Sequence, residues 1–154
     1  MTLRAEKGFC HRVAVRYGEV DLQGVVFNAH YLAYCDDAVE TWFRQIGFGS
    51  AGPGSEGGPG AEVGRHGWDF MLKKVVVEWQ GSAGLGDLMT IDVAVSRWGR
   101  TSFDVGFVGT VKLRPVFTAT ITYVGVAAGT KTPMEPPPSV REALGDAPPP
   151  PTAA

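Results

Sequence analysis

The order of hydrophobic periodicities constrains the fold of this chain more than any other feature. One pattern of alternating apolar and polar residues precedes a single pattern with helical spacing, and four more alternating patterns follow. The patterns cover about residues 9–17, 31–46, 70–80, 88–98, 101–111 and 116–127. The sequence Trp98-Gly99-Arg100 predicts a tight antiparallel hairpin between the third and fourth strands. We therefore predict an α+β domain in which a five-stranded antiparallel sheet wraps one long central helix.

Glycine and proline are concentrated in two segments outside these patterns. Residues 47–67 hold nine of the 21 glycines, and residues 130–154 hold eight of the 11 prolines. Dense glycine keeps the entropy of an unfolded segment high, so the first segment is predicted to be a flexible loop or lid. We interpret residues 1–129 as one domain and residues 130–154 as a proline-rich tail, partly disordered, with a helical turn at 139–144.

Charge, cysteine content and hydropathy exclude several functional classes. A formal net charge of -2 with interspersed signs argues against the broad basic surface of nucleic-acid-binding proteins. Cys10 and Cys35 form neither a disulfide framework nor a metal-binding spacing. No apolar run reaches the roughly 18–20 residues of a membrane span, and Met1–Phe9 lacks a signal-peptide pattern. We expect a cytoplasmic protein with no cofactor, no metal, and no nucleic-acid or membrane partner.

The strongest candidates for chemistry lie between the first strand and the helix. Asp21 is followed by Gly24, which allows close approach of the backbone. Asn28 is a predicted N-cap for a helix that begins near Ala29. A helix N-terminus stabilises developing negative charge, and a nearby carboxylate serves as nucleophile or as general base on water. The pattern is not specific, because an Asp in such a turn commonly bonds only its own turn.

Two segments resemble a known enzyme family. Residues 16–44, RYGEVDLQGVVFNAHYLAYCDDAVETWFR, are similar to the signature of the 4-hydroxybenzoyl-CoA thioesterase-like branch of the hotdog-fold acyl-CoA thioesterases. Residues 95–105, VSRWGRTSFDV, are similar to the family's third-to-fourth strand hairpin. The resemblance implies a hotdog fold over about residues 8–128, a catalytic Asp21, an oxyanion-polarising backbone amide at Asn28 and an active-site loop at 22–27.

The resemblance also has consequences for assembly and selectivity. It implies that two chains pair edge to edge, with active sites at the interface of a homodimer or homotetramer. The exposed edges of an antiparallel sheet independently favour such pairing. Asn28 stands where close relatives often have His, which removes a titratable side chain but keeps the backbone amide. The long glycine-rich loop leaves acyl-chain selectivity open.

We therefore predict an acyl-CoA thioesterase that hydrolyses a thioester to a carboxylate and free CoA. The predicted substrate-binding residues around the loop are Gly24, Val25, Val26, Phe27 and Tyr31. Cations and hydroxyl groups suit the CoA phosphates, and the hairpin supplies them in Arg97, Arg100, Thr101 and Ser102. Further phosphate candidates, whose position the pattern does not define, are Lys73, Lys74, Arg65 and Arg114.

Several assignments have alternatives. A base could come from the helix, through Asp36, Asp37 or Glu40, although Glu40 is also spaced for an ion pair with Arg44. His30 is a further candidate at the helix start. The aromatic residues Tyr31, Trp42, Trp68 and Phe70 either line an acyl pocket or belong to the core. The alternative functions are hydrolysis of an acyl-pantetheine on a carrier protein, and acyl-CoA binding without catalysis.

Overall fold

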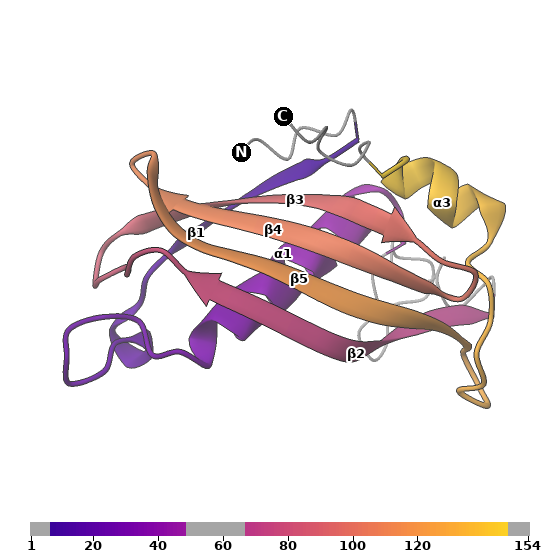
Figure 1. Cartoon of the computed structure of the whole chain (residues 1–154), viewed down its shortest axis with the longest axis horizontal. Helices are drawn as coiled ribbons and strands as arrows, with labels where there is room; N and C mark the ends of the chain where they lie inside the picture. The colour runs from indigo at the N-terminus through magenta and orange to yellow at the C-terminus, as the bar shows by residue number, and fades with distance from the viewer. Residues whose placement is uncertain (1–6, 49–66, 148–154) are drawn as a thin grey trace, which may run out of the picture.

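The computed structural model describes residues 7–48 and 67–147 (Figure 1). The elements are β1 (Phe9–Ala14), a 3-10 turn η1 (Tyr17–Glu19), α1 (His30–Gln45), β2 (Trp68–Trp79), β3 (Leu88–Trp98), β4 (Ser102–Val111), β5 (Arg114–Ala127) and α3 (Pro138–Leu144). This is the predicted order of strands and helix, and the helical turn predicted at 139–144 forms as α3. Neither described helix is long and apolar enough to cross a membrane. Most of the glycine-rich segment predicted as a loop or lid lies outside the described residues.

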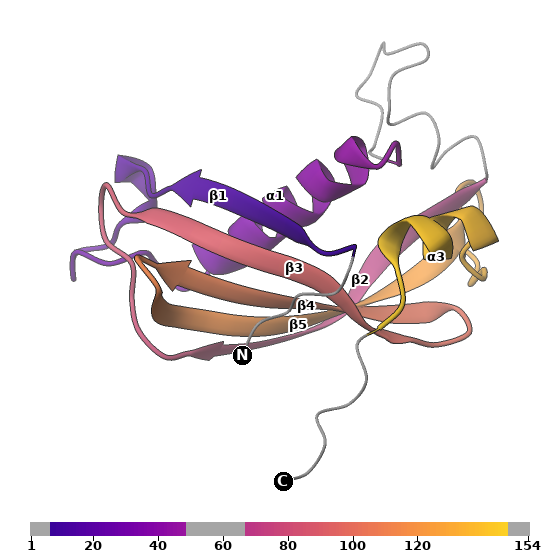
Figure 2. The ribbon, with the colours of Figure 1, turned by 90° about the horizontal axis from the view of Figure 1, so that it is seen from above.

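The strands form one antiparallel sheet in the order β1-β3-β4-β5-β2. The predicted hairpin joins β3 to β4, whose pairing runs from Met89–Val111 to Trp98–Phe103. Figure 2 shows α1 along one face of this sheet. The α+β architecture with a five-stranded antiparallel sheet is therefore confirmed. α1 has the 16 residues that the helical pattern predicts, but it is not long relative to the sheet, because it spans about 24 Å whereas the 14 residues of β5 span about 46 Å.

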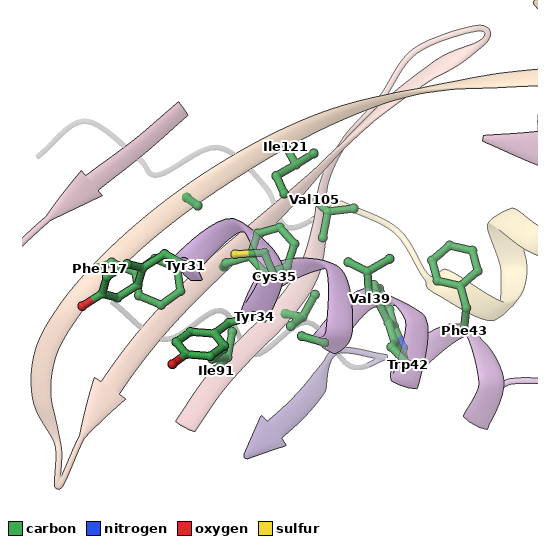
Figure 3. Close-up of a cluster of buried hydrophobic side chains, with 14 of the residues drawn as sticks. Tyr31, Tyr34, Cys35, Val39, Trp42, Phe43, Ile91, Val105, Phe117 and Ile121 are labelled. Carbon is green, nitrogen blue, oxygen red and sulfur yellow. The ribbon is translucent and has the colours of Figure 1, made fainter. Parts of the chain in front are cut away.

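The core lies between α1 and the sheet face that the helix covers (Figure 3). Apolar side chains that recur three and four residues apart give α1 one buried stripe. Its buried members are Tyr31, Tyr34, Cys35, Ala38, Val39, Trp42 and Phe43. They meet inward-facing strand residues such as Ile91, Val105 and Ile121. Each large apolar side chain buried here contributes roughly 1.5–3 kcal/mol, so this layer is the main source of stability.

The C-terminal segment packs on the end of the sheet where β3 turns into β4. α3 buries Val140 and Leu144, and the indole Nε1 of Trp98 donates to the Gly145 carbonyl oxygen at 3.0 Å. The guanidinium of Arg141 lies over the Trp98 ring, 4.9 Å from its centre. Residues 130–147 therefore contact the sheet rather than standing apart from it.

Candidate active site

The segment between β1 and α1 folds into a narrow hydrogen-bonded loop with Asp21 near its tip. The Phe27 amide donates to the Glu19 carbonyl at 2.9 Å, and the Asp21 amide donates to the Val25 carbonyl at 2.9 Å. Gly24 adopts φ 79°, a left-handed conformation that costs glycine little, and so closes the tip. Asp21 and the start of α1 thus belong to one small unit of backbone.

The Asp21 side chain is half-buried, and the loop holds one of its two oxygens. Oδ1 accepts a hydrogen bond from the Gln23 amide at 2.8 Å, the contact expected of an Asp that stabilises its own turn. Oδ2 has no hydrogen-bond partner among the described residues. The turn contact therefore orients the carboxylate and leaves one oxygen available for chemistry.

The start of the helix differs from the prediction. Ala29 occupies the N-cap position of α1 and no side chain caps the helix, so the predicted capping contact of the Asn28 side chain is wrong. Backbone carbonyls accept the hydrogen bonds of the first turn instead. The His30 amide donates to the Phe27 carbonyl at 2.9 Å, and the Tyr31 amide donates to the Asn28 carbonyl at 3.4 Å. Within the described residues the Asn28 and Ala29 amides have no acceptor. Two amides thus remain that could donate to a substrate carbonyl oxygen.

The hydrogen-bond register separates the Asp21 carboxylate from these amides. Asp21 faces Val25, and Asn28 lies three residues beyond Val25, about 10 Å along an extended chain. The two predicted catalytic groups therefore share one loop, and no hydrogen bond joins them among the described residues.

The other predicted loop residues divide between the core and the surface. Val26 is buried, and its amide donates to the Ala83 carbonyl at 2.9 Å. Tyr31 is also buried, with its hydroxyl oxygen 3.4 Å from the Ala83 amide. Val25, half-buried, pairs with the neighbouring backbone at residue 84. Phe27 is 50% exposed, so it is an apolar side chain on the surface beside the loop, where a ligand or a second chain could cover it.

The predicted phosphate-binding residues lie at the opposite end of the sheet. β3 begins beside the Asp21 loop, where the Val15 amide donates to the Asp87 carbonyl at 2.9 Å. The strand then runs 11 residues, about 35 Å, before it reaches the hairpin that holds Thr101. A single chain therefore keeps the hairpin far from Asp21.

The two hairpin arginines have different surroundings. Arg97 donates to the Asp104 carboxylate at 2.8 and 3.1 Å and to the Ser102 hydroxyl at 3.1 Å. Arg100 has a side chain that is 79% exposed, and its nearest described carboxylate, that of Glu135, is 3.8 Å away. Arg97 is thus already neutralised by a carboxylate, whereas Arg100 is available to an anion.

A polar groove beside the hairpin adds a second arginine that the sequence analysis missed. The groove is lined by Trp98, Gly99, Arg100, Glu135, Pro136, Pro138 and Arg141. Arg141 comes from α3 and also donates to the Gly99 carbonyl. No periodicity predicts that α3 docks here, so only the fold brings Arg141 beside Arg100.

A cavity of about 250 Å³ lies between the C-terminal half of α1, β2 and β5. It is lined by Asp36, Val39, Glu40, Phe43, Phe48, Asp69, Phe70 and Tyr123. Burial, together with the Glu40 carboxylate, raises the pKa of Asp36 above its usual range. Phe70 thus lines a cavity, as predicted, whereas Trp68, Trp42 and Tyr31 are buried in the core. The cavity combines an aromatic wall with carboxylates on its helix side.

The remaining helix candidates have contacts of their own. Asp37 Oδ2 lies 2.8 Å from Nε2 of His11, which links α1 to β1. Arg44 donates to the Thr41 hydroxyl at 3.4 Å and, within the described residues, forms no ion pair with Glu40, so the predicted pair is wrong. Burial raises the pKa of the Cys35 thiol to about 12, as expected of an inert core cysteine. Over the described ranges no cluster of His, Cys, Asp or Glu could hold a metal ion.

Glu19 is a functional candidate that no sequence pattern identified. Its side chain is buried at 8% exposure and lies two positions before Asp21. Hydrogen bonds from Arg16 hold the pKa of this carboxyl well below its usual range, at about 2. The available signal in the sequence was an arginine and a glutamate three residues apart, Arg16 and Glu19. This spacing indicates an ion pair only in a turn, and Tyr17–Glu19 forms one because β1 ends at Ala14 instead of near the predicted residue 17.

Comparison with known proteins agrees with this architecture. A solved structure of a hypothetical protein from Aquifex aeolicus superimposes with a TM-score of 0.75 at 20% identity, covering 89% of this chain and 99% of that one. A 1,4-dihydroxy-2-naphthoyl-CoA thioesterase from Synechocystis has a TM-score of 0.74 at 16% identity, with 89% and 95% covered. A probable thioesterase from Escherichia coli has a TM-score of 0.71 at 22% identity, with 88% and 95% covered.

Sequence comparison identifies the family. None of the curated proteins compared with this sequence matches it. The family model of the thioesterase-like superfamily matches residues 15–144, which include the Asp21 loop, α1, the strands β2 to β5 and α3. The resemblance seen in residues 16–44 and 95–105 is therefore confirmed, and the chain belongs to the thioesterase-like superfamily.

Proposed function

We propose that this protein is an acyl-CoA thioesterase in which Asp21 performs the chemistry. The observation that carries the proposal is the Asp21 carboxylate, oriented by the Gln23 amide with one oxygen free, in the loop that leads to the unpaired amides of α1. As general base, the carboxylate takes a proton from water while the water oxygen bonds to the thioester carbon. The carbon–sulfur bond then breaks, and the proton passes to the CoA thiolate. As nucleophile, the carboxylate bonds to the thioester carbon, and the carbon–sulfur bond breaks to give a mixed anhydride and the CoA thiolate. Water then hydrolyses the anhydride, which restores Asp21 and releases the acyl carboxylate, while a proton from the water passes to the thiolate.

We infer that the complete site needs two chains joined at β2. This strand is a sheet edge with 12 residues, and it exposes Met71, Leu72, Val76 and Trp79. Such an edge is a template for pairing with another chain. Within one chain, the Trp79 end of β2 lies at the start of α1, because the Trp79 and Tyr31 rings are 5.8 Å apart. The Trp68 end lies at the hairpin, with the Trp68 and Phe103 rings 6.1 Å apart.

Antiparallel pairing of β2 about a twofold axis reverses the second chain end for end. The Asp21 loop of one chain then lies at the same end of the dimer as the cavity and the Arg100 groove of the other. This arrangement supplies what a single chain lacks, since one chain separates the Asp21 loop from the Arg100 groove by about the length of β3. We propose a homodimer, or a tetramer made of such dimers, with two sites of this composite kind.

In this composite site the cavity takes the acyl group. Its aromatic wall, with Phe43, Phe70 and Tyr123, favours an apolar or aromatic acyl group. The carboxylates of Asp36 and Glu40 disfavour acyl groups that carry a free carboxylate of their own, because like charges repel at low dielectric. A structural neighbour acts on 1,4-dihydroxy-2-naphthoyl-CoA, so aromatic acyl-CoAs are the first substrates to test.

The groove at the hairpin binds the CoA phosphates. Arg100 is exposed, Arg141 lies across the groove, and the turn adds the hydroxyl groups of Thr101 and Ser102. Arg97 has a supporting part, because its contacts with Asp104 and Ser102 hold the turn. We propose a cytoplasmic location, and the reaction as written uses only protein groups and water.

A thiol-release assay with a panel of acyl-CoAs tests the proposed function. The panel contains aromatic, aliphatic and dicarboxylic acyl-CoAs, each matched with the corresponding acyl-pantetheine and with the same acyl group loaded on a carrier protein. We expect turnover of an aromatic or apolar acyl-CoA, with lower kcat/KM for the acyl-pantetheine that lacks phosphates. Preference for acyl groups loaded on a carrier protein would indicate the alternative thioesterase. Saturable binding without any thiol release would contradict the proposal and indicate an acyl-CoA-binding protein.

A further inference from the structure

Glu19 connects three parts of the candidate site. Its carboxylate Oε1 accepts hydrogen bonds from the Arg16 amide at 2.8 Å and from the Tyr34 hydroxyl at 2.9 Å. Oε2 accepts from Nη2 and Nε of the same arginine at 2.8 and 3.2 Å. The backbone carbonyl of Glu19 accepts from the Phe27 amide at 2.9 Å. One residue therefore joins the chain after β1, the Asp21 loop and the second turn of α1.

We propose that Glu19 is a positioning residue that sets the place of Asp21 relative to α1. The inference rests on the proposed function of Asp21. Tyr34 lies one turn beyond the first turn of the helix, so its bond to Glu19 ties the base of the loop to a rigid element. The Glu19–Phe27 backbone bond then transmits this position across the loop, and the Asp21–Val25 bond carries it to the tip. A loop of this length has no other buried polar anchor to α1 among the described residues.

A direct proton-transfer role for Glu19 does not fit its surroundings. Both carboxylate oxygens are occupied by donors, and the side chain is buried. With its pKa at about 2, the group stays ionised and accepts no proton near neutral pH. The hydrogen bonds from Arg16 are the main cause of this low pKa. The role left to Glu19 is geometric.

A geometric role also explains why a charge occupies this position. Burial of an ion pair gives little net stability, because the loss of hydration offsets much of the attraction, and apolar side chains of similar volume often serve stability equally well. Hydrogen bonds from both Arg16 and Tyr34, by contrast, fix a direction as well as a contact. The location of Asp21 must be held closely, since a displacement of about 1 Å can cost 100-fold in rate.

The test compares Glu19→Gln with Tyr34→Phe, the double variant, and Thr41→Ala as control. Thr41→Ala removes another side-chain hydrogen bond from α1, that of the Thr41 hydroxyl to the Asp37 carbonyl. We expect Glu19→Gln to lower kcat about 10- to 100-fold with KM changed less than about threefold. Tyr34→Phe should lower kcat less, and the double variant should be no worse than Glu19→Gln. The pH midpoint of the remaining activity should match that of the wild type, and Thr41→Ala should keep wild-type kcat.

Three outcomes would overturn the proposal. A folded Glu19→Gln protein with wild-type kcat would show a structural role only, and loss of one limb of the pH–rate profile would show proton transfer. Hydrogen exchange provides a readout that does not depend on activity. We expect faster exchange at the Asp21 and Phe27 amides in Glu19→Gln and in Tyr34→Phe. Exchange at the β4 amides should stay at the wild-type rate. Unchanged hydrogen exchange in the loop of these variants would also overturn the proposal. If the wild-type protein shows no turnover but the variants still exchange faster in the loop, only the proposed function is refuted.

Discussion

Two carboxylates in the loop before α1 have opposite environments. Asp21 is half-buried and keeps one oxygen without a partner among the described residues, whereas both oxygens of Glu19 accept hydrogen bonds. The first arrangement suits a group that must act on a substrate, and the second suits a group that must stay in place. The division of roles within three residues of sequence therefore follows from hydrogen bonding and burial.

The low pKa of Glu19 predicts how stability depends on pH. A carboxyl whose pKa falls from 4.5 in its ordinary state to about 2 in the folded protein stabilises the fold above pH 4.5. That contribution declines as the pH falls from 4.5 to about 2. We expect Glu19→Gln to lower the free energy of unfolding at pH 7 by on the order of 2 kcal/mol. The effect is smaller than the full pKa shift would give, because solvent partly screens the exposed Arg16. Urea unfolding should show this difference shrink at pH 3, and a difference that stays constant with pH would contradict the prediction.

Arg100 should contribute to binding rather than to the chemical step. Replacement by Ala removes a charge-assisted contact worth about 1.5–3 kcal/mol, so KM for acyl-CoA should rise about 10-fold or more with kcat little changed. Steady-state kinetics at low salt provide the measurement. Arg12→Ala, which removes an exposed arginine from β1, is the matched control and should leave KM unchanged. Equal KM values for wild type and Arg100→Ala would place the phosphates elsewhere.

At the scale of elements, periodicity predicted the five strands and α1 because one face of each is buried. Val75 and Val77 on β2, and Ile91 and Val93 on β3, alternate with more exposed residues and needed no tertiary information. The start of α1 was misplaced because the Asn28 pattern suggests a capping side chain, while the backbone carbonyls of the loop satisfy the first turn. Local patterns predict elements better than the contacts at their ends.

The close approach of β4 to β5 makes Gly109 a sensitive position. A Cβ atom there would lie 2.1 Å from Cε1 of Phe117, whose ring packs on Tyr31 at 5.2 Å. Gly109→Ala should therefore displace Phe117 and lower the free energy of unfolding by about 1–3 kcal/mol. Gly129→Ala is the control, since nothing lies within 4 Å of its Cβ position. Chemical denaturation measures both, and equal stability of the two variants would contradict the packing argument.

The exposed edge of β2 should control assembly. Leu72→Lys combined with Val76→Lys places new positive charges on an exposed strand, so the chains of a β2-paired dimer repel each other while the monomer stays folded. Sedimentation analysis should show a dimer or tetramer for wild type and monomers for the variant, with activity lost together with assembly. Ala14→Lys, on the opposite edge strand β1, is the control. A monomeric and fully active wild-type protein would contradict the composite site.

At the scale of the whole molecule, the candidate site is divided between the two ends of the sheet. The Asp21 loop lies at one end, and the Arg100 groove lies at the other, about the length of β3 away. The sequence analysis could assign residues to both parts from local motifs. It could not place them relative to each other, and it missed Arg141 and Glu19, whose contacts connect segments 42 and 15 residues apart. Long-range contacts of this kind depend on the fold and leave no local pattern.

The kcat of Asp21→Asn on the best acyl-CoA, measured with the melting temperature, tests whether Asp21 performs the chemistry. Asn keeps the shape of the side chain and an oxygen that can accept from the Gln23 amide, but it removes the charge and the basicity. We expect a folded protein that binds substrate with kcat reduced about 100- to 10,000-fold, which corresponds to a rise of roughly 3–5.5 kcal/mol in activation free energy. A folded Asp21→Asn protein that retains more than about a tenth of wild-type kcat would contradict this expectation and transfer the role to Asp36, Asp37 or Glu40.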